Sequence, residues 1–121
     1  MKEIKFRAKV KFDGNISNMD RLAYGLYRRF KDFHYIDNIP IEPETLGQYI
    51  KKNDRNGKDI YEGDIVTGIY KDMLGYNAGD IKGVVKFVNG EIIVSDGITD
   101  YIIRNITDIQ VIGNVIDNPE L

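Results

Sequence analysis

The stretch LGQYIKKNDRNGKDIYEGDIV, from Leu46 to Val66, decides the fold. An apolar run ends at Ile50, a polar turn follows, and a second apolar run begins at Ile60. The dipeptide Asn56-Gly57 in that turn is the strongest short signal for a β-hairpin, because both residue types tolerate positive φ. The stretch therefore predicts two strands joined by a tight turn, with Gly57 at positive φ.

The composition is that of a soluble globular protein. The sequence has 121 residues, of which 42% are hydrophobic and 30% are charged, and we expect one domain spanning residues 1–121. The formal net charge of −2 does not suggest a field that attracts nucleic acid or anionic lipid. The absence of cysteine excludes disulfides and thiolate chemistry. The sequence shows neither a signal peptide nor a membrane span, so we expect a cytoplasmic protein.

Apolar and basic residues alternate with period two from Ile4 to Phe12, which predicts a half-buried strand. The basic face is interpreted as a solvated surface that discourages edge pairing, rather than as a stripe for phosphates, because the whole chain is not basic. The inward residues are predicted to be Ile4, Phe6, Ala8, Val10 and Phe12, and the outward ones Lys5, Arg7, Lys9 and Lys11.

Short strands separated by Gly, Asn and Asp turns indicate an all-β sandwich or small barrel. The segment from Arg21 to Phe30 also has helical spacing of leucines, but Gly25 and the aromatic density favour a hairpin. Residues 101–105 fit either a short strand or a helical turn. Strands are predicted at 22–29, 33–39, 64–70, 81–88, 91–95 and 108–116, a loop at 71–80, and a helical turn at 43–45.

Three segments carry a resemblance to a known family. They are EIKFRA at residues 3–8, PETLGQYIKKNDRNGKDIYEGDIV at 43–66, and IQVIGNVIDNPEL at 109–121. Together they resemble the YopX family of phage and prophage proteins. The chain departs from that family at Lys51-Lys52-Asn53, where threonine-glycine-leucine is usual, and at Ala8-Lys9, where tryptophan and aspartate are common.

The resemblance implies a small, closed or nearly closed β pseudo-barrel with a short helical cap and some likeness to SH3-type barrels. It also implies a phage-encoded protein that works in the cytoplasm of an infected bacterium. It implies no catalytic residue and no ligand.

The acidic turn around Asp54 resembles a calcium loop at first sight. When Gly57 is placed at the sixth position of such a loop, Lys52 and Gly63 fall where carboxylates are required, so the motif fails. The single histidine, His34, has no recognisable catalytic partners in the sequence. We therefore expect no metal, no cofactor and no catalytic residues.

The region from Tyr24 to Tyr35 interleaves aromatic and basic residues, as surfaces that bind single-stranded nucleic acid do. The favoured interpretation is that the aromatic side chains fill the core while the charges are solvated. If the region does bind nucleic acid, the phosphate contacts would be Arg28, Arg29 and Lys31, and the stacking platforms Tyr24 and Tyr35.

The sequence thus predicts a non-catalytic binding or assembly protein that acts through a protein partner or as a homo-oligomer. The alternative is a small nucleic-acid-binding β-barrel. An enzyme is the least supported class, and no membrane partner is expected.

Overall fold

The computed structural model describes residues 4–11 and 21–119, and these are mostly β-strands. The all-β prediction is confirmed, and the described helical segments are two single turns, η2 (Pro43–Thr45) and η3 (Ile103–Asn105). Neither could span a membrane. The chain forms two compact units, Met1–Lys51 and Lys52–Leu121. The expectation of one domain stays a prediction.

The first unit is built on strand β1 (Phe6–Lys9), which lies between two antiparallel neighbours. On one side it pairs with β2 (Leu22–Gly25), and on the other with the start of β6 (Gly47–Asn53). A small apolar core forms beside β1, with Phe6, Tyr27, Ile39 and Leu46 packed against it. The buried members of that core are Ala8, Val10, Ala23, Ile36 and Ile41.

The predicted burial of the first strand is only partly right. Ala8 and Val10 are buried, but Ile4 is exposed and Arg7, expected outside, is only 3% exposed. Polar side chains here are also partly covered; just before β1, the Lys5 ammonium lies 4.9 Å from the ring centre of Tyr49. Phe6, Lys5 and Lys9 are half-buried, Lys11 is exposed, and Phe12 lies outside the described residues.

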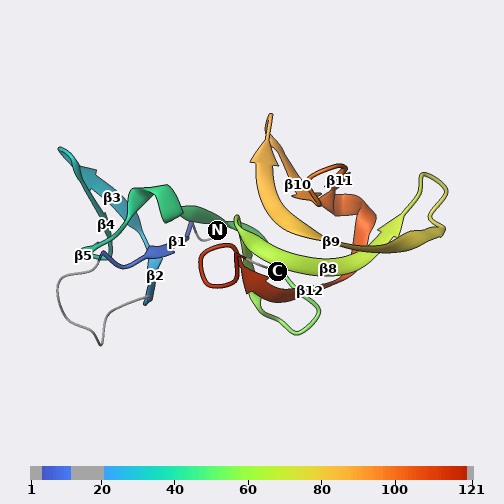
Figure 1. The fold of residues 1–121 in the computed structure, drawn as a ribbon, viewed down its shortest axis with the longest axis horizontal. Coiled ribbons are helices and arrows are strands. Elements are labelled where there is room, and N and C mark those ends of the chain that lie inside the picture. Colours follow the sequence, from blue (N-terminus) through green and yellow to red (C-terminus); the bar gives the residue numbers. More distant parts are fainter. Residues whose placement is uncertain (1–3, 12–20, 120–121) are drawn as a thin grey trace. The chain divides into compact units, whose positions relative to one another are not determined.

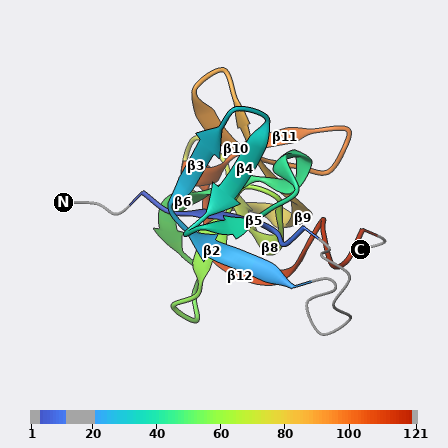
Figure 2. The same ribbon diagram turned by 90° about the vertical axis from the view of Figure 1, so that its left-hand side faces the viewer.

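The predicted hairpin is confirmed as β3 (Tyr27–Phe30) and β4 (Phe33–Ile36), which pair antiparallel, with β5 (Ile39–Pro40) beside β4 (Figure 2). The strand predicted at 22–29 is broken at Leu26, however, and the one predicted at 33–39 turns back at Asp37 and Asn38, whose φ values are 48° and 68°. Gly25 has a φ of +149°, and a Cβ placed there would overlap the carboxylate of Asp37. The Leu26 main-chain N–H donates a hydrogen bond to Asp37 Oδ1. In return, the Asp37 main-chain N–H donates to the Leu26 carbonyl. This bend moves the chain out of the β1 sheet.

The second unit is a five-stranded antiparallel sheet in the order β11-β10-β9-β8-β12, which curls into a half-barrel (Figure 1). Its buried residues include Val66, Val85 and Val94. The strands are β8 (Asp64–Lys71), β9 (Asn77–Val88), β10 (Glu91–Ser95), β11 (Asp100–Ile102) and β12 (Ile106–Asn114).

The turn signals of the central stretch are confirmed. The chain turns between Asp54 and Lys58 into β7 (Asp59–Tyr61), and Gly57 has a φ of +82°. Gly63, with a φ of +93°, makes the second bend, where the buried Asp64 carboxylate accepts a hydrogen bond from the Tyr61 N–H at 2.8 Å. The Asn89-Gly90 turn and the irregularity at Gly113 are also present.

Two predictions in this unit need correction. The loop expected at 71–80 is shorter, because β9 begins at Asn77 and pairs with the end of β8. The backbone of Gly79, at a φ of +125°, lets the extended pairing continue through a conformation that other residues rarely adopt. The two readings of residues 101–105 are both partly right, since β11 ends at Ile102 and η3 follows.

Candidate functional site: an aromatic hairpin and its pocket

The β3–β4 hairpin has two different faces. Cross-strand pairing places Arg28 opposite Tyr35 and Phe30 opposite Phe33. Because side chains alternate along a strand, these four residues share one face, here called the hairpin face. Phe30 is 58% exposed and Phe33 is 55% exposed. The hairpin face therefore presents a cross-strand aromatic pair to solvent.

The polar groups of the hairpin face are held in place. The Arg28 guanidinium lies 4.9 Å from the ring centre of Tyr35, and its Nη2 donates a hydrogen bond to Asn38 Oδ1 at 2.7 Å. The Lys31 ammonium lies 5.6 Å from the ring centre of Phe30. Both cations thus lie over aromatic rings, a favourable electrostatic arrangement that also orders the rings.

The opposite face of the hairpin packs against the rest of the first unit. The hydroxyl of Tyr27 is hydrogen-bonded to His34 Nδ1 at 2.6 Å, and the two rings stack with their centres 5.9 Å apart. The ring of Phe6 packs on Tyr27, and Ile36 is fully buried. The single histidine is therefore part of a packed aromatic pair that fixes the position of β4 against β3.

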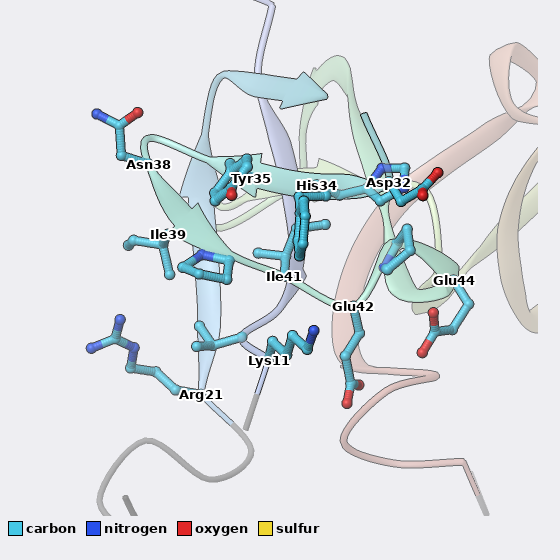
Figure 3. Close-up of a pocket in the computed structure, with 14 residues that line it drawn as sticks. Lys11, Arg21, Asp32, His34, Tyr35, Asn38, Ile39, Ile41, Glu42 and Glu44 are labelled. Carbon is cyan, nitrogen blue, oxygen red and sulfur yellow. The ribbon is translucent and has the colours of Figure 1, made fainter. Parts of the chain in front are cut away.

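A pocket of about 730 Å³ opens beside β4 and β5, and is here called the hairpin pocket (Figure 3). Its lining mixes apolar and charged residues. In Figure 3 Asp32 and Glu44 lie toward one side, Arg21 lies toward the other, and Lys11 and Glu42 lie next to each other between them. The lining residues are Val10, Lys11, Arg21, Asp32, Phe33, His34, Tyr35, Asn38, Ile39, Pro40, Ile41, Glu42, Pro43 and Glu44.

The structure brings most of the sequence-predicted residues together. Arg28, Lys31 and Tyr35 lie on or beside the hairpin face, while Arg29 pairs with His34 and uses its Nε to donate to the Lys31 carbonyl at 2.8 Å. Tyr24 belongs to β2, in another sheet, where it is opposite Arg7 and 52% exposed.

Two features were missed by sequence reasoning. The aromatic side chains were expected to fill the core, yet the rings of Phe30 and Phe33 are exposed. Phe30 and Phe33 pair directly across the Lys31-Asp32 turn, and their side chains lie on the face of the hairpin opposite the buried Ile36. The pocket was also missed, because residues from several segments meet there. The sequence signal nearest to it is the pair of prolines, Pro40 at the end of β5 and Pro43 at the start of η2, which keep this stretch from forming a longer strand.

The acidic residues of the central turn are used by the main chain. Asp54 is buried, and its carboxylate accepts hydrogen bonds from the N–H groups of Asn56, Lys58 and Val111. Burial raises the pKa of Asp54, but these hydrogen bonds and the charge of Lys58 together hold the pKa below its ordinary value. Among residues 4–11 and 21–119, no group of three or more acidic or histidine side chains is arranged to hold a metal ion.

Fold and site together define a small all-β protein with two units, each built of antiparallel strands. An aromatic hairpin lies beside a pocket in the first unit. A family model described as YopX protein matches residues 5–121, so the chain belongs to the YopX family. The resemblance found in the sequence is thereby confirmed. A search of curated proteins finds no match.

Proposed function

We propose that this chain is a non-catalytic binding module, encoded by a phage and working in the cytoplasm of the infected bacterium, which captures an exposed segment of a protein partner. The contact surface is the hairpin face together with the hairpin pocket. The observation that carries the proposal is the exposed Phe30–Phe33 pair, of which Phe33 also lines the hairpin pocket together with Tyr35.

The hairpin face has the composition of an interface centre. Aromatic residues and arginine dominate the energetics of protein–protein contacts. Covering one phenylalanine ring contributes about 1.5–3 kcal/mol. Because the Asn38 hydrogen bond and the Tyr35 ring already hold Arg28, its side chain loses little freedom on binding.

The pocket indicates the chemistry of the bound segment. Its lining includes Ile39, Pro40 and Tyr35, which favour an apolar side chain. Glu44 and Asp32 lie toward one side in Figure 3 and favour a basic group there, Arg21 favours an acidic group on the other side, and Lys11 lies beside Glu42 between them. We therefore propose a partner segment that is apolar, with a basic residue toward one end and an acidic residue toward the other.

A displayed library of random dodecapeptides tests this function. Peptides selected on the immobilised protein are synthesised with a fluorescent label and titrated by anisotropy. Pro40→Glu places a charge in the pocket lining at an exposed position and weakens binding at least tenfold. Ile98→Ser, at a 94% exposed position in the second unit, is the matched control and leaves the affinity unchanged. Failure to select any peptide, or equal binding by the Pro40→Glu protein, would overturn the proposal.

Nucleic-acid binding is the second candidate. The observation in its favour is that Arg28 and Lys31 lie on the rings of Tyr35 and Phe30, as basic and aromatic groups do on surfaces that bind single strands. It ranks second because the chain has a net charge of −2, and the pocket lining, with three carboxylates against Lys11 and Arg21, is not basic either.

A further inference from the structure

Strand β3 lies at one edge of its sheet, whose strand order is β3-β4-β5. Three of its four residues are exposed, and Tyr27 is half-buried. In the part of the chain that the structure describes, β4 is the only strand that pairs with β3. The main-chain groups on the far side of β3, here called the β3 edge, can therefore receive a further strand.

The pairing pattern shows which main-chain groups the β3 edge presents. The Asp37 N–H donates to the carbonyl of Leu26, the residue opposite, so this is a hydrogen-bonded position of the ladder. Because bonded and non-bonded positions alternate in an antiparallel pair, the main chain of Arg28 is bonded to β4 as well. The N–H and C=O groups of Tyr27 and Arg29 therefore point away from β4.

The other side of β4 agrees with this pattern. The Ile41 N–H donates a hydrogen bond of 3.0 Å to the His34 carbonyl, so the main chain of His34 faces β5. Its neighbours Phe33 and Tyr35 then face β3, because successive main-chain groups point to opposite sides of a strand. Both sets of hydrogen bonds place the same two residues of β3 outward.

The side chains of β3 give its edge a positive charge. Arg28 lies on the hairpin face and Arg29 on the opposite face, because side chains alternate along a strand. The acidic residues nearest in sequence, Asp32 and Asp37, lie at the two ends of β4 rather than on β3. A strand placed beside β3 therefore meets a positive charge on each of its two faces.

These charges disfavour a second copy as the occupant of the β3 edge. In any antiparallel register that overlaps most of two β3 strands, an arginine of one copy lies opposite an arginine of the other. Like charges directly opposite each other destabilise a strand pair, whereas opposite charges stabilise it. A nucleic acid would match the charge, but it has no peptide main chain to pair with the outward groups of Tyr27 and Arg29.

We propose that the β3 edge binds an extended, acidic segment of a protein partner as an added strand. The segment complements Tyr27-Arg28-Arg29-Phe30, and so carries two adjacent acidic residues between two apolar ones. Main-chain hydrogen bonds supply the affinity and the charges supply the specificity. This inference goes beyond the proposed function, because the hairpin pocket lies beside β4 and β5 and the β3 edge on the other side of β4.

An amide NMR titration of the ¹⁵N-labelled protein tests the inference. The probe is the peptide acetyl-TVEEVT-amide, and acetyl-TVKKVT-amide is the control of reversed charge. Because a short strand with two exposed ion pairs binds weakly, each peptide is added up to roughly 5 mM. The acidic peptide should shift the amide signals of Tyr27 and Arg29, which gain an acceptor, more than those of Arg28 and Phe30, which are already bonded to β4. The basic peptide should bind at least about fivefold more weakly.

Two further comparisons separate strand pairing from simple charge attraction. A pair of acidic peptides is N-methylated at alternate amides, one at the odd and the other at the even positions. Only every second amide of an added strand faces β3, so one of these peptides should bind and the other should not. Arg29→Glu should weaken the acidic peptide at least about fivefold, whereas Pro40→Glu, in the pocket lining, should leave its affinity unchanged. The methylated peptides test the same contact on the unaltered protein if the Arg29 variant fails to fold.

Absence of a saturable shift at Tyr27 and Arg29 would overturn the inference, as would equal binding of the acidic and basic peptides or of the two methylated peptides. Shifts at these two amides that depend on protein concentration alone would identify a second copy as the occupant instead. The same shifts on addition of a single-stranded oligonucleotide would identify nucleic acid. In each of these cases, a selected peptide that still binds the hairpin pocket leaves the proposed function standing.

Discussion

The main-chain N–H of Val111 donates a hydrogen bond of 2.9 Å to Oδ2 of Asp54, a residue 57 positions earlier in the chain. The other oxygen of the same carboxylate accepts the N–H groups of Asn56 and Lys58. One buried side chain thus closes the central turn and joins it to β12.

Replacing Asp54 with alanine should leave three N–H donors without this acceptor and lower the free energy of unfolding by about 2–4 kcal/mol. Asp72→Ala is the matched control, because it removes the two equivalent turn bonds at an exposed site but no bond to a distant strand. It should cost about 1 kcal/mol. Urea unfolding measures both, and equal losses would contradict a structural role for the Val111 bond.

The pKa of Asp54 predicts a dependence of stability on acid. Its pKa is lower in the folded chain than the ordinary value of 3.8, so the carboxylate stabilises the fold above about pH 4. That contribution should be lost as the pH falls from about 4 through the folded-state pKa. Asp54→Asn, which does not titrate, should show a smaller loss over the same range. Urea midpoints of the wild type and of Asp54→Asn, measured between about pH 6 and pH 2, test this prediction. Identical pH profiles for the two proteins would contradict it.

Gly25 should be harder to replace than Gly57. A Cβ at Gly25 displaces the Asp37 carboxylate from its hydrogen bond with the Leu26 N–H, and φ is +149°, so Gly25→Ala should cost about 2–3 kcal/mol. Gly57→Ala is the matched control, because φ is also positive but nothing lies within 4 Å of the new atom. It should cost about 1 kcal/mol. Similar melting temperatures for the two variants would show that the Gly25–Asp37 contact is not what breaks the strand.

Binding to nucleic acid should be weak. Three phosphate contacts, from Arg28, Arg29 and Lys31, imply a salt slope of only about −2 on a single strand. We expect little or no binding to random single- or double-stranded DNA at about 0.15 M salt, near physiological ionic strength. Anisotropy titrations of labelled oligonucleotides at low and at physiological salt measure this. Sub-micromolar binding that survives the higher salt and is lost in Arg28→Ala with Arg29→Ala would place nucleic acid first among the proposed functions.

Local signals predicted the turns well. Gly57, Gly63 and the Asn89-Gly90 pair lie at the bends expected of them, because a positive φ is a property of one or two residues. The β3–β4 hairpin was predicted from Gly25 and the aromatic density instead, since the residue with positive φ at its turn is Lys31, at 54°, which is not a residue type that signals a turn.

Burial and the site depended on distant partners and could not be predicted. Arg7 is buried together with its neighbour Ala8, so both faces of β1 are covered there, which an alternating pattern does not reveal. The break at Leu26 depends on Asp37, eleven residues away, and the pocket on segments that meet only in the fold. The sequence raised Asp54 only as a metal ligand, whereas in the structure its carboxylate accepts a hydrogen bond from the N–H of Val111, on the last strand.

The most direct test of the proposed function is an amide NMR titration of the ¹⁵N-labelled protein with a selected peptide. We predict that the largest changes in amide chemical shift fall around the hairpin pocket, on Phe33, His34, Tyr35 and Ile39, and disappear in the Pro40→Glu protein. Largest changes in the second unit, for example along β8 or β12, that persist in the Pro40→Glu protein would contradict it.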